Sequence, residues 1–333
     1  MSELTVEMHP ILGVYLGSCA AKIKKNGQPD LVVIELVQGS LTVATFTQNA
    51  FCAAPVTVAK QALAATMPRA LVINSGNANA GTGKQGMIDA KQTCAWVAAE
   101  LGCQPNEVLP FSTGVIGENL PMDKLQLGIP EALANLSITG WPQACKGIMT
   151  TDLVPKAVSR EVMVEGHSVM ITGISKGSGM IHPNMATMLG FVATDAKITQ
   201  ACLQQCLTDA VNVSFNRITV DGDTSTNDAC TLTATQQADM PVIDSQDSKG
   251  YQDFSKAIAE VMTELAQLII RDGEGATKFV TVLVEGGGNS EECLKVAHAV
   301  ALSPLVKTAL FASDPNWGRI LAAVGRAGLL DLD

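Results

Sequence analysis

The chain has 333 residues, of which 47% are hydrophobic and 16% charged, a balance typical of a folded globular protein and not of a disordered one. This length allows one large domain or two. The net charge of −10 excludes a nucleic-acid backbone as the main partner, because such binders need a basic face. A small, polar, charged metabolite is therefore the expected ligand.

The periodicity of apolar residues alternates between strand and helix along the whole length. In chain order it predicts strands at 30–37, 41–47 and 70–74, a helix at 86–101, strands at 168–174 and 187–195, a helix capped by Thr199, a longer helix at 256–271 and a final strand at 278–286. The longer helix places a set of apolar side chains on one face, namely Ile258, Val261, Met262, Leu265 and Ile269. The mixture predicts an α/β or α+β fold.

The N-terminal apolar run ILGVYLGSCAA (11–21) has the wrong flanking charges for a signal peptide. Glu3 and Glu7 precede it and three lysines follow it, whereas a signal needs positive charge before its apolar segment. No stretch approaches the roughly 20 apolar residues of a membrane span. The sequence therefore predicts a cytoplasmic protein.

The nine cysteines and four histidines show no metal-binding pattern. No two cysteines form a CxxC pair, so we expect no zinc site. An odd number of unpaired thiols is typical of a reducing cytosol.

Four segments are rich in Gly, Asn, Thr and Asp: NSGNANAGTG (74–83), FSTGVIG (111–117), SKGSGM (175–180) and DGDTSTND (221–228). Each alone is typical of a turn. None matches a nucleotide-binding glycine pattern. In the second segment, Thr113 and Gly114 in a tight turn would direct adjacent N–H groups and a hydroxyl to one point, which is what an oxyanion hole requires.

Among hydroxyls and thiols, Thr187 has the best place for a nucleophile. It lies where a glycine-rich bend containing Lys176 runs into a strand, and no G-x-S-x-G elbow offers a serine instead. Cleavage of the Ala186–Thr187 bond would release an α-amino group to act as its base. Such a group has an unperturbed pKa of about 7.7–8.0, which suits proton transfer near neutral pH.

The motif KGSGMIHPNMATML (176–189) resembles the ornithine acetyltransferase (ArgJ) family of arginine biosynthesis. Six further motifs occur in the family's order, namely NSGNANAGTG, STGVIG, IMTTD, DGDTSTND, DGEGATK and DPNWGRILAAVGRAG. The resemblance implies the family's self-cleaving fold, with a threonine nucleophile at the start of a central strand. Cleavage would give an α fragment, 1–186, and a β fragment, 187–333.

The resemblance also implies the reaction and its site. Acetyl would pass from N-acetylornithine to glutamate through acetyl-Thr187, with acetyl-CoA as a second candidate donor and no bound cofactor. The oxyanion pair corresponds to Thr113 and Gly114. Substrate contacts correspond to Thr150, Lys176, Thr187 and Glu274. The family further implies paired fragments that assemble as a dimer of heterodimers or larger.

Family chains usually continue several dozen residues past VGRAG, whereas this sequence ends at Asp333. The family's tail supplies an Asn and a small hydroxyl residue to the pocket, so this chain is either a shortened form or closes its pocket differently. Two alternatives stay open at this point: a threonine-nucleophile amidohydrolase or aminopeptidase, in which water accepts the acyl group, and a non-catalytic remnant.

Overall fold

The computed structural model describes residues 6–182, 188–330 and 332, and places two β-sheets face to face. The first sheet has the strand order β1-β2-β4-β5, formed by β1 (Val14–Cys19), β2 (Leu31–Leu36), β4 (Ala70–Asn77) and β5 (Val108–Val115). Only β4 and β5 in this sheet run parallel.

The second sheet has the strand order β3-β9-β8-β7-β6. It contains β3 (Leu41–Phe46), β6 (Lys156–Val164), β7 (His167–Lys176), β8 (Leu189–Thr194) and β9 (Ala229–Ala234). Strands β8 and β9 are parallel and begin level with each other, while β7 runs antiparallel to β8 and ends opposite the start of β8. One edge of the sheet therefore collects the end of β7 and the starts of β8 and β9.

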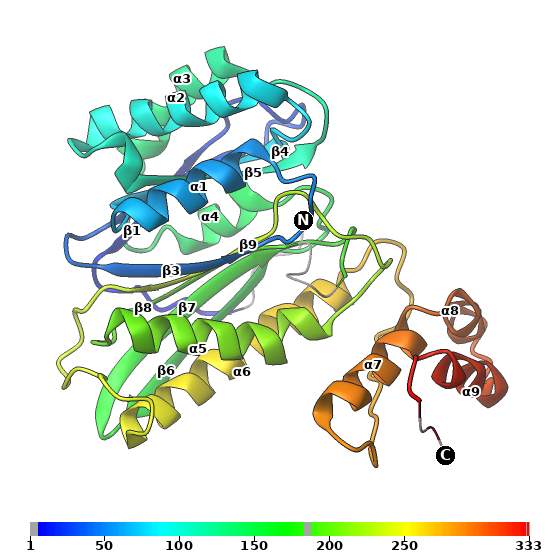
Figure 1. The fold of residues 1–333 in the computed structure, drawn as a ribbon. Coiled ribbons are helices and arrows are strands. Elements are labelled where there is room, and N and C mark those ends of the chain that lie inside the picture. Colours follow the sequence, from blue (N-terminus) through cyan, green and yellow to red (C-terminus); the bar gives the residue numbers. More distant parts are fainter. Residues whose placement is uncertain (1–5, 183–187, 331, 333) are drawn as a thin grey trace.

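Helices cover both outer faces and enter between the sheets (Figure 1). Helices α2 (Gly83–Leu101) and α3 (Met122–Ala134) pack on the first sheet, whereas α5 (Gln200–Val213) and α6 (Lys249–Arg271) pack on the second. Helix α4 (Trp141–Ile148) contacts both sheets, and α1 (Ala54–Ala65) lies beside β5. Short 3-10 turns follow α2 and α5, at Pro105–Glu107 and Phe215–Arg217.

Successive side chains of each strand point to opposite faces of its sheet, and this alternation divides the core into layers. In β2, Val32 and Ile34 face the second sheet, whereas Leu31 and Val33 face α2 and α3. Between the sheets, the ring of Phe111 from β5 meets that of Phe191 from β8 edge to face, with centroids 5.1 Å apart. Strands β2 and β8 are buried on both faces, which explains why their sequences are mostly apolar.

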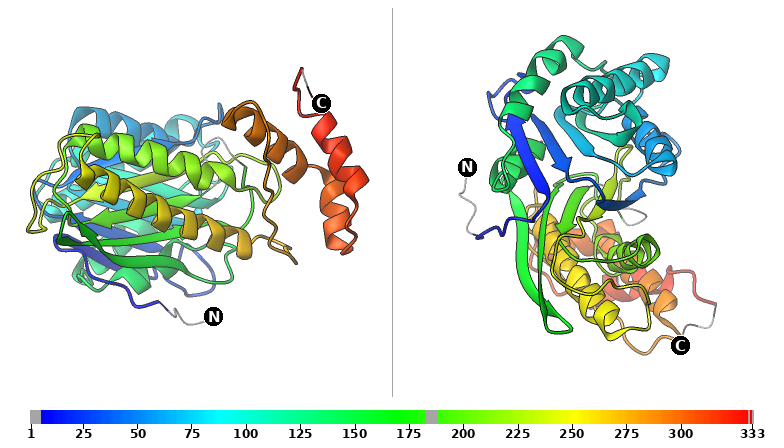
Figure 2. Two further views of the ribbon diagram at one scale, coloured as in Figure 1. Left: turned by 90° about the horizontal axis from the view of Figure 1, so that it is seen from below. Right: turned by 90° about the vertical axis from the view of Figure 1, so that its left-hand side faces the viewer.

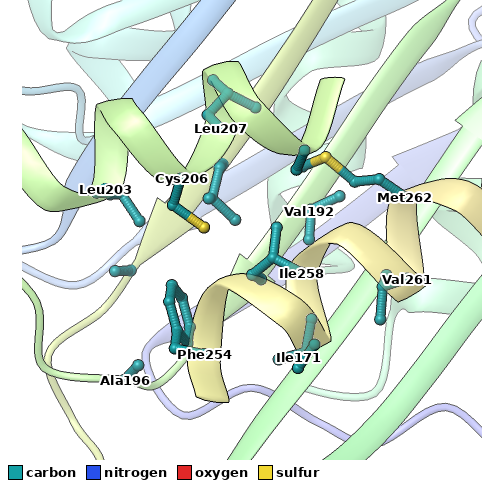
Figure 3. Packing of buried hydrophobic residues seen from close by; sticks show 14 of the residues in the cluster. Ile171, Val192, Ala196, Leu203, Cys206, Leu207, Phe254, Ile258, Val261 and Met262 are labelled. Carbon is teal, nitrogen blue, oxygen red and sulfur yellow. The ribbon is translucent and has the colours of Figure 1, made fainter. Parts of the chain in front are cut away.

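The elements predicted up to residue 271 are confirmed, with three differences at helix starts. The helix predicted at 86–101 begins at Gly83. All five apolar residues predicted to face inward from α6 are buried, against α5 and the second sheet (Figure 3). However, α6 begins at Lys249, where the Ser248 side chain caps it by accepting the Tyr251 N–H. Thr199 occupies the N-cap position of α5, but its side chain makes no capping hydrogen bond.

The predicted strand at 278–286 is wrong. This segment pairs with no strand within the described part of the chain, and Val280 and Leu283 are 42% and 78% exposed. Strand propensity alone does not make a strand, because the hydrogen-bond ladder needs a partner. The segment leads to α7 (Ser290–Ala301), α8 (Pro304–Phe311) and α9 (Trp317–Gly325), which stand beside the two-sheet body (Figure 2).

Over the described residues, no single helix is long and apolar enough to span a membrane. Helices α7 and α8 satisfy that test together, but a bend of 60° separates them.

Shortening the fully buried Phe254 side chain should destabilise the protein strongly. Phe254 sits in the core between α5 and α6, and Phe254→Ala should lower the free energy of unfolding by about 3–5 kcal/mol, since it loses apolar burial and leaves a cavity. Leu127→Ala in α3, where the side chain is 79% exposed, should change it by less than about 0.5 kcal/mol. Urea unfolding checks both, and equal losses would contradict this packing.

Candidate active site

The end of β7 and the end of β5 meet through one hydrogen bond. The Lys176 Nζ donates to the Thr113 Oγ1 at 2.9 Å, and both residues are buried. Burial lowers the pKa of Lys176, although the carboxylates of Asp152 and Asp228 act in the opposite direction. Thr113 and Lys176 are 63 residues apart in the sequence, and the sequence analysis predicted both for one site. The structure brings them together.

Gly114 and Thr113 do not form the tight turn predicted for them, because both lie within β5 and pair with β4. Gly114 has a φ of 134°, and a Cβ on it would lie 2.3 Å from the Gly76 carbonyl carbon. Only glycine allows the two main chains to approach this closely. The predicted oxyanion pair, Thr113 and Gly114 (hereafter the oxyanion pair), therefore lies near the end of a paired strand, where β4 and β5 change register.

A buried ion cluster lies beneath this pair. The Lys156 Nζ lies 2.6 Å from both the Asp152 Oδ1 and the Asp272 Oδ2, and all three side chains are buried. Asp152 also accepts the N–H groups of Thr150, at 2.9 Å, and Gly177, at 2.8 Å. The cluster therefore ties together the main chain at Thr150, the residue after Lys176 and the C-terminal end of α6.

The charges around Asp152 keep it ionised despite its burial. Burial would raise the pKa of Asp152, but Lys176 and Lys156 outweigh that effect and lower it to about 2. A third lysine, Lys24, donates from its Nζ to the Met149 carbonyl at 3.1 Å, and burial lowers its pKa. The region is thus a buried set of alternating positive and negative charges.

Glu274 is exposed and lies against the loop that follows β7. Its N–H donates to the Ser178 carbonyl at 2.7 Å, and a Cβ on Gly179 would lie 2.4 Å from its Oε2. Asp221 fixes the same loop by accepting the N–H of Met180 at 2.6 Å. The carboxylate of Glu274 therefore stands close to the chain that leads from Lys176 toward the predicted cleavage position.

The segment STND (225–228) joins this edge to β5. The Asn227 side chain donates to the carbonyls of Ala78 and Ser112, at 2.7 and 2.9 Å. Ser112 directly precedes Thr113, so Asn227 braces the oxyanion pair from the second sheet.

Of the predicted site residues, Thr113, Gly114, Thr150, Lys176 and Glu274 gather around the end of β7. Ala186 and Thr187 lie outside the described residues; Met188, which follows them, is buried.

Sequence reasoning missed the buried cluster. Asp152 and Asp272 stand in the quoted motifs IMTTD and DGEGATK, but nothing in those motifs shows that Lys156 joins them.

A groove of about 720 Å³ lies elsewhere, between α6, residues 279–287 and α7, and it is lined by none of the predicted site residues that the structure describes. Over the described residues, no group of three His, Cys, Asp or Glu side chains could hold a metal ion.

The ArgJ family model matches residues 15–333. The chain belongs to the ArgJ family. It is 56% identical over 326 residues to the arginine biosynthesis bifunctional protein ArgJ of Pseudomonas syringae pv. tomato, and 56% over 328 residues to that of Methylococcus capsulatus. Each alignment covers 98% of this chain and 80% of the relative. The crystal structure of the arginine biosynthesis bifunctional protein ArgJ of Bacillus halodurans is 34% identical, with a TM-score of 0.49, and covers 56% of this chain and 97% of that one.

The ArgJ family and the α/β fold predicted from the motifs are thereby confirmed. The match runs through both sheets and the three C-terminal helices, so the site described above belongs to the part of the chain that is similar to its relatives.

A side chain at Gly114 should separate β4 from β5. In Gly114→Ala the backbone keeps a strained φ and the new Cβ also collides with the Gly76 main chain. In Gly117→Ala the backbone has a φ of 87°, but no atom lies within 4 Å of the new Cβ. We expect Gly117→Ala to cost about 1–3 kcal/mol of unfolding free energy and Gly114→Ala clearly more. Thermal melts compare the two, and equal losses would show that β5 can shift.

Removing the central lysine of the buried cluster should be costly. Lys156→Met removes the lysine paired with Asp272 and leaves Asp152 with the charge of Lys176 alone, which should lower the free energy of unfolding by about 3–5 kcal/mol. Lys249→Met removes a lysine from an exposed ion pair with Asp253 and should leave stability unchanged. Denaturant titration measures both, and a Lys156→Met protein as stable as the control would rule out a charged cluster.

Proposed function

We propose that the chain is an acyltransferase of arginine biosynthesis that moves acetyl from N2-acetyl-L-ornithine to L-glutamate through an ester on Thr187. The observation that carries this proposal is the family match across residues 15–333, together with the hydrogen bond that joins Lys176 to Thr113. Relatives named for arginine biosynthesis share more than half of the residues.

The proposed first step is self-cleavage between Ala186 and Thr187, which gives fragments 1–186 and 187–333. The sheet pairing supports it, because the two strands of the second fragment, β8 and β9, lie between strands of the first fragment in the second sheet. β7 of the first fragment pairs with β8 of the second over six residue pairs, and β3 of the first pairs with β9 of the second over another six. A cut two residues before β8 therefore leaves its new N-terminus held at the sheet edge.

Acetyl transfer then follows in two balanced steps. The Thr187 hydroxyl oxygen attacks the acetyl carbonyl carbon while its proton passes to the Thr187 α-amino group, and the C–N bond to ornithine breaks as that proton moves to the departing nitrogen. The neutral amino nitrogen of glutamate next attacks the ester carbonyl carbon and gives a proton to the Thr187 α-amino group, which passes it to the Thr187 oxygen as the C–O bond breaks. Both steps pass through a tetrahedral oxyanion.

The described residues have the chemistry that these steps need. Because the Thr113 oxygen accepts from Lys176, its own proton is available to an oxyanion, beside the N–H of Gly114. The positive charge of Lys176 disfavours an ammonium on Thr187 and keeps more of it in the basic form. The exposed carboxylate of Glu274 suits the ammonium of ornithine, and the half-buried Thr150 offers a hydroxyl to polar substrate groups.

We further propose that acetyl-CoA serves as a second acetyl donor, that no separate cofactor is needed, and that the protein acts on small molecules in the cytoplasm. The two fragments stay paired and assemble as a dimer of heterodimers or larger. The relatives' description as bifunctional supports a second donor.

Replacing the proposed nucleophile should abolish cleavage and transfer together. Thr187→Ala should give one intact chain, whereas the unmodified protein should give fragments of about 19 and 15 kDa in proportion to their lengths. Thr199→Ala, which removes a hydroxyl that makes no capping bond, should still be cleaved and active. Intact-mass measurement and ping-pong kinetics provide the test.

Two results would favour the other hypotheses. Release of free acetate in place of acetylglutamate would indicate a threonine-nucleophile amidohydrolase, and an uncleaved, inactive wild-type protein would indicate a non-catalytic remnant. Cleavage that persists in Thr187→Ala would contradict the proposed nucleophile.

A further inference from the structure

The motif DGDTSTND (221–228) contacts both sides of the candidate site, although no step of the proposed reaction uses it. Near its start, the carboxylate of Asp221 accepts the N–H groups of Met180 and Ile181, at 2.6 and 3.1 Å, in the loop that follows β7. Near its end, the side chain of Asn227 donates to two carbonyl groups of the first sheet and its adjoining chain. One short segment therefore joins the loop after β7 to the strand of the oxyanion pair.

Asn227 lies where β4 and β5 approach most closely. Its Nδ2 donates to the Ala78 carbonyl at 2.7 Å and to the Ser112 carbonyl at 2.9 Å. Ala78 comes two residues after Gly76 in the chain. Ser112 comes two residues before Gly114, and a Cβ on Gly114 would collide with the Gly76 main chain. These two hydrogen bonds, hereafter the Asn227 clamp, thus tie the end of β4 to β5 across the point where their register changes.

The chemistry of the clamp is specific to an amide. Both partners of the Asn227 nitrogen are carbonyl oxygens, which only accept hydrogen bonds, so the side-chain NH2 group faces them and uses both of its donors. The Asn227 oxygen accepts from the hydroxyl of Thr226. Because Asn227 is buried, loss of its side chain would leave two carbonyl oxygens without these donors in a place that water reaches poorly.

The main chain that carries Asn227 is held on the second sheet. The Ser225 carbonyl accepts from the Thr47 hydroxyl at 2.8 Å, and the Thr226 carbonyl accepts the Ala53 N–H at 3.0 Å. Thr47 directly follows β3, and the motif leads directly into β9, the strand that pairs with β3. The clamp therefore fixes β5 relative to the second sheet, and not merely relative to a loop.

We propose that Asn227 is a positioning residue that fixes the direction in which the Thr113 hydroxyl and the Gly114 N–H face the developing oxyanion. This inference rests on the proposed function, because the oxyanion forms only during acyl transfer. The Ser112 carbonyl belongs to the same planar peptide unit as the Thr113 nitrogen, so holding the one fixes the orientation of the other. A misdirected donor stabilises the transition state less and leaves substrate binding intact.

The test compares two side chains at opposite ends of β9. Asn227→Ala removes the clamp. Gln236→Ala is the matched control, because the Gln236 side chain also makes two hydrogen bonds to main chain, both with Ile198, past the far end of β9. Thermal melting checks that both proteins fold, and intact-mass measurement counts the cleaved molecules, to which all rates are referred.

We expect only Asn227→Ala to slow the chemical step. In a single turnover with N2-acetyl-L-ornithine, its maximal rate of acetyl-enzyme formation should fall about 10- to 100-fold as the oxyanion pair loses its alignment. The half-saturating concentration of the donor should stay within about twofold, because the contacts proposed for the bound substrate come from other residues. Gln236→Ala should match the wild type in both values. A purely structural role would lower the melting temperature without this split.

A maximal rate within about twofold of wild type in folded, cleaved Asn227→Ala would overturn the proposal. So would an equal loss of rate in Gln236→Ala. If Asn227→Ala fails to fold or to be cleaved, Thr226→Val decides. This change keeps the side-chain shape and removes the hydroxyl that holds the Asn227 oxygen, so the maximal rate should fall about 3- to 10-fold. An unchanged rate in Thr226→Val would then reject the proposal.

Failure of the proposed function and failure of this inference give different results. A cleaved wild-type protein that transfers no acetyl group would contradict the acetyltransferase. Amide hydrogen exchange still tests the clamp in that protein, since exchange at residues 112–115 should be faster in Asn227→Ala than in the wild type and unchanged in Gln236→Ala. Equal exchange at these residues in all three proteins would overturn the clamp.

Discussion

The pairing of β8 with β7 on one side and β9 on the other is the constraint on which the site depends. Antiparallel pairing brings the end of β7 to the start of β8, and parallel pairing brings the start of β9 to the same edge. Lys176, Met188 and Asp228 therefore meet without any long loop to position them. A one-residue slip of β8 would exchange its two faces, both of which are buried, so the register is strongly fixed.

The buried charges around Lys156 fix the main chain around that sheet edge. Their burial costs desolvation free energy, and an apolar cluster of the same volume would often be at least as stable. What the charges add is geometry, because Lys156 holds two carboxylates that in turn hold the main chain. Asp152 accepts the N–H groups of Thr150 and Gly177, and Asp272 accepts that of Leu153. Three segments distant in sequence can then present the groups proposed to contact substrate at fixed separations.

Local periodicity predicted the strands β2, β3, β4, β7 and β8 and the helices α2, α5 and α6, whose apolar faces local spacing reveals, but it did not predict β1, β5, β6 or β9. The strand prediction failed at 278–286, where residues of high strand propensity have no partner strand within the described residues. The turn prediction failed at Gly114, because this glycine allows β4 and β5 to approach closely and forms no turn. Motif resemblance named Thr113 and Lys176 as site residues, and their hydrogen bond is seen only in the fold. The pairing of Lys156 with Asp272, 116 residues away, has no local signal at all.

The fold also explains how one peptide bond at this place could be cut without loss of the structure. Both cores that touch the second sheet contain side chains from each side of residue 187: Ile174 and Phe191 share the core between the sheets, and Ile171 and Val192 share the core beneath α5 and α6. Separating the two pieces would expose both apolar layers and break two strand ladders, a cost far above the association entropy of two chains. The proposed cut would therefore free a nitrogen two residues before a strand that stays paired on both sides, so the folded sheet would hold together the chain that carries the proposed base.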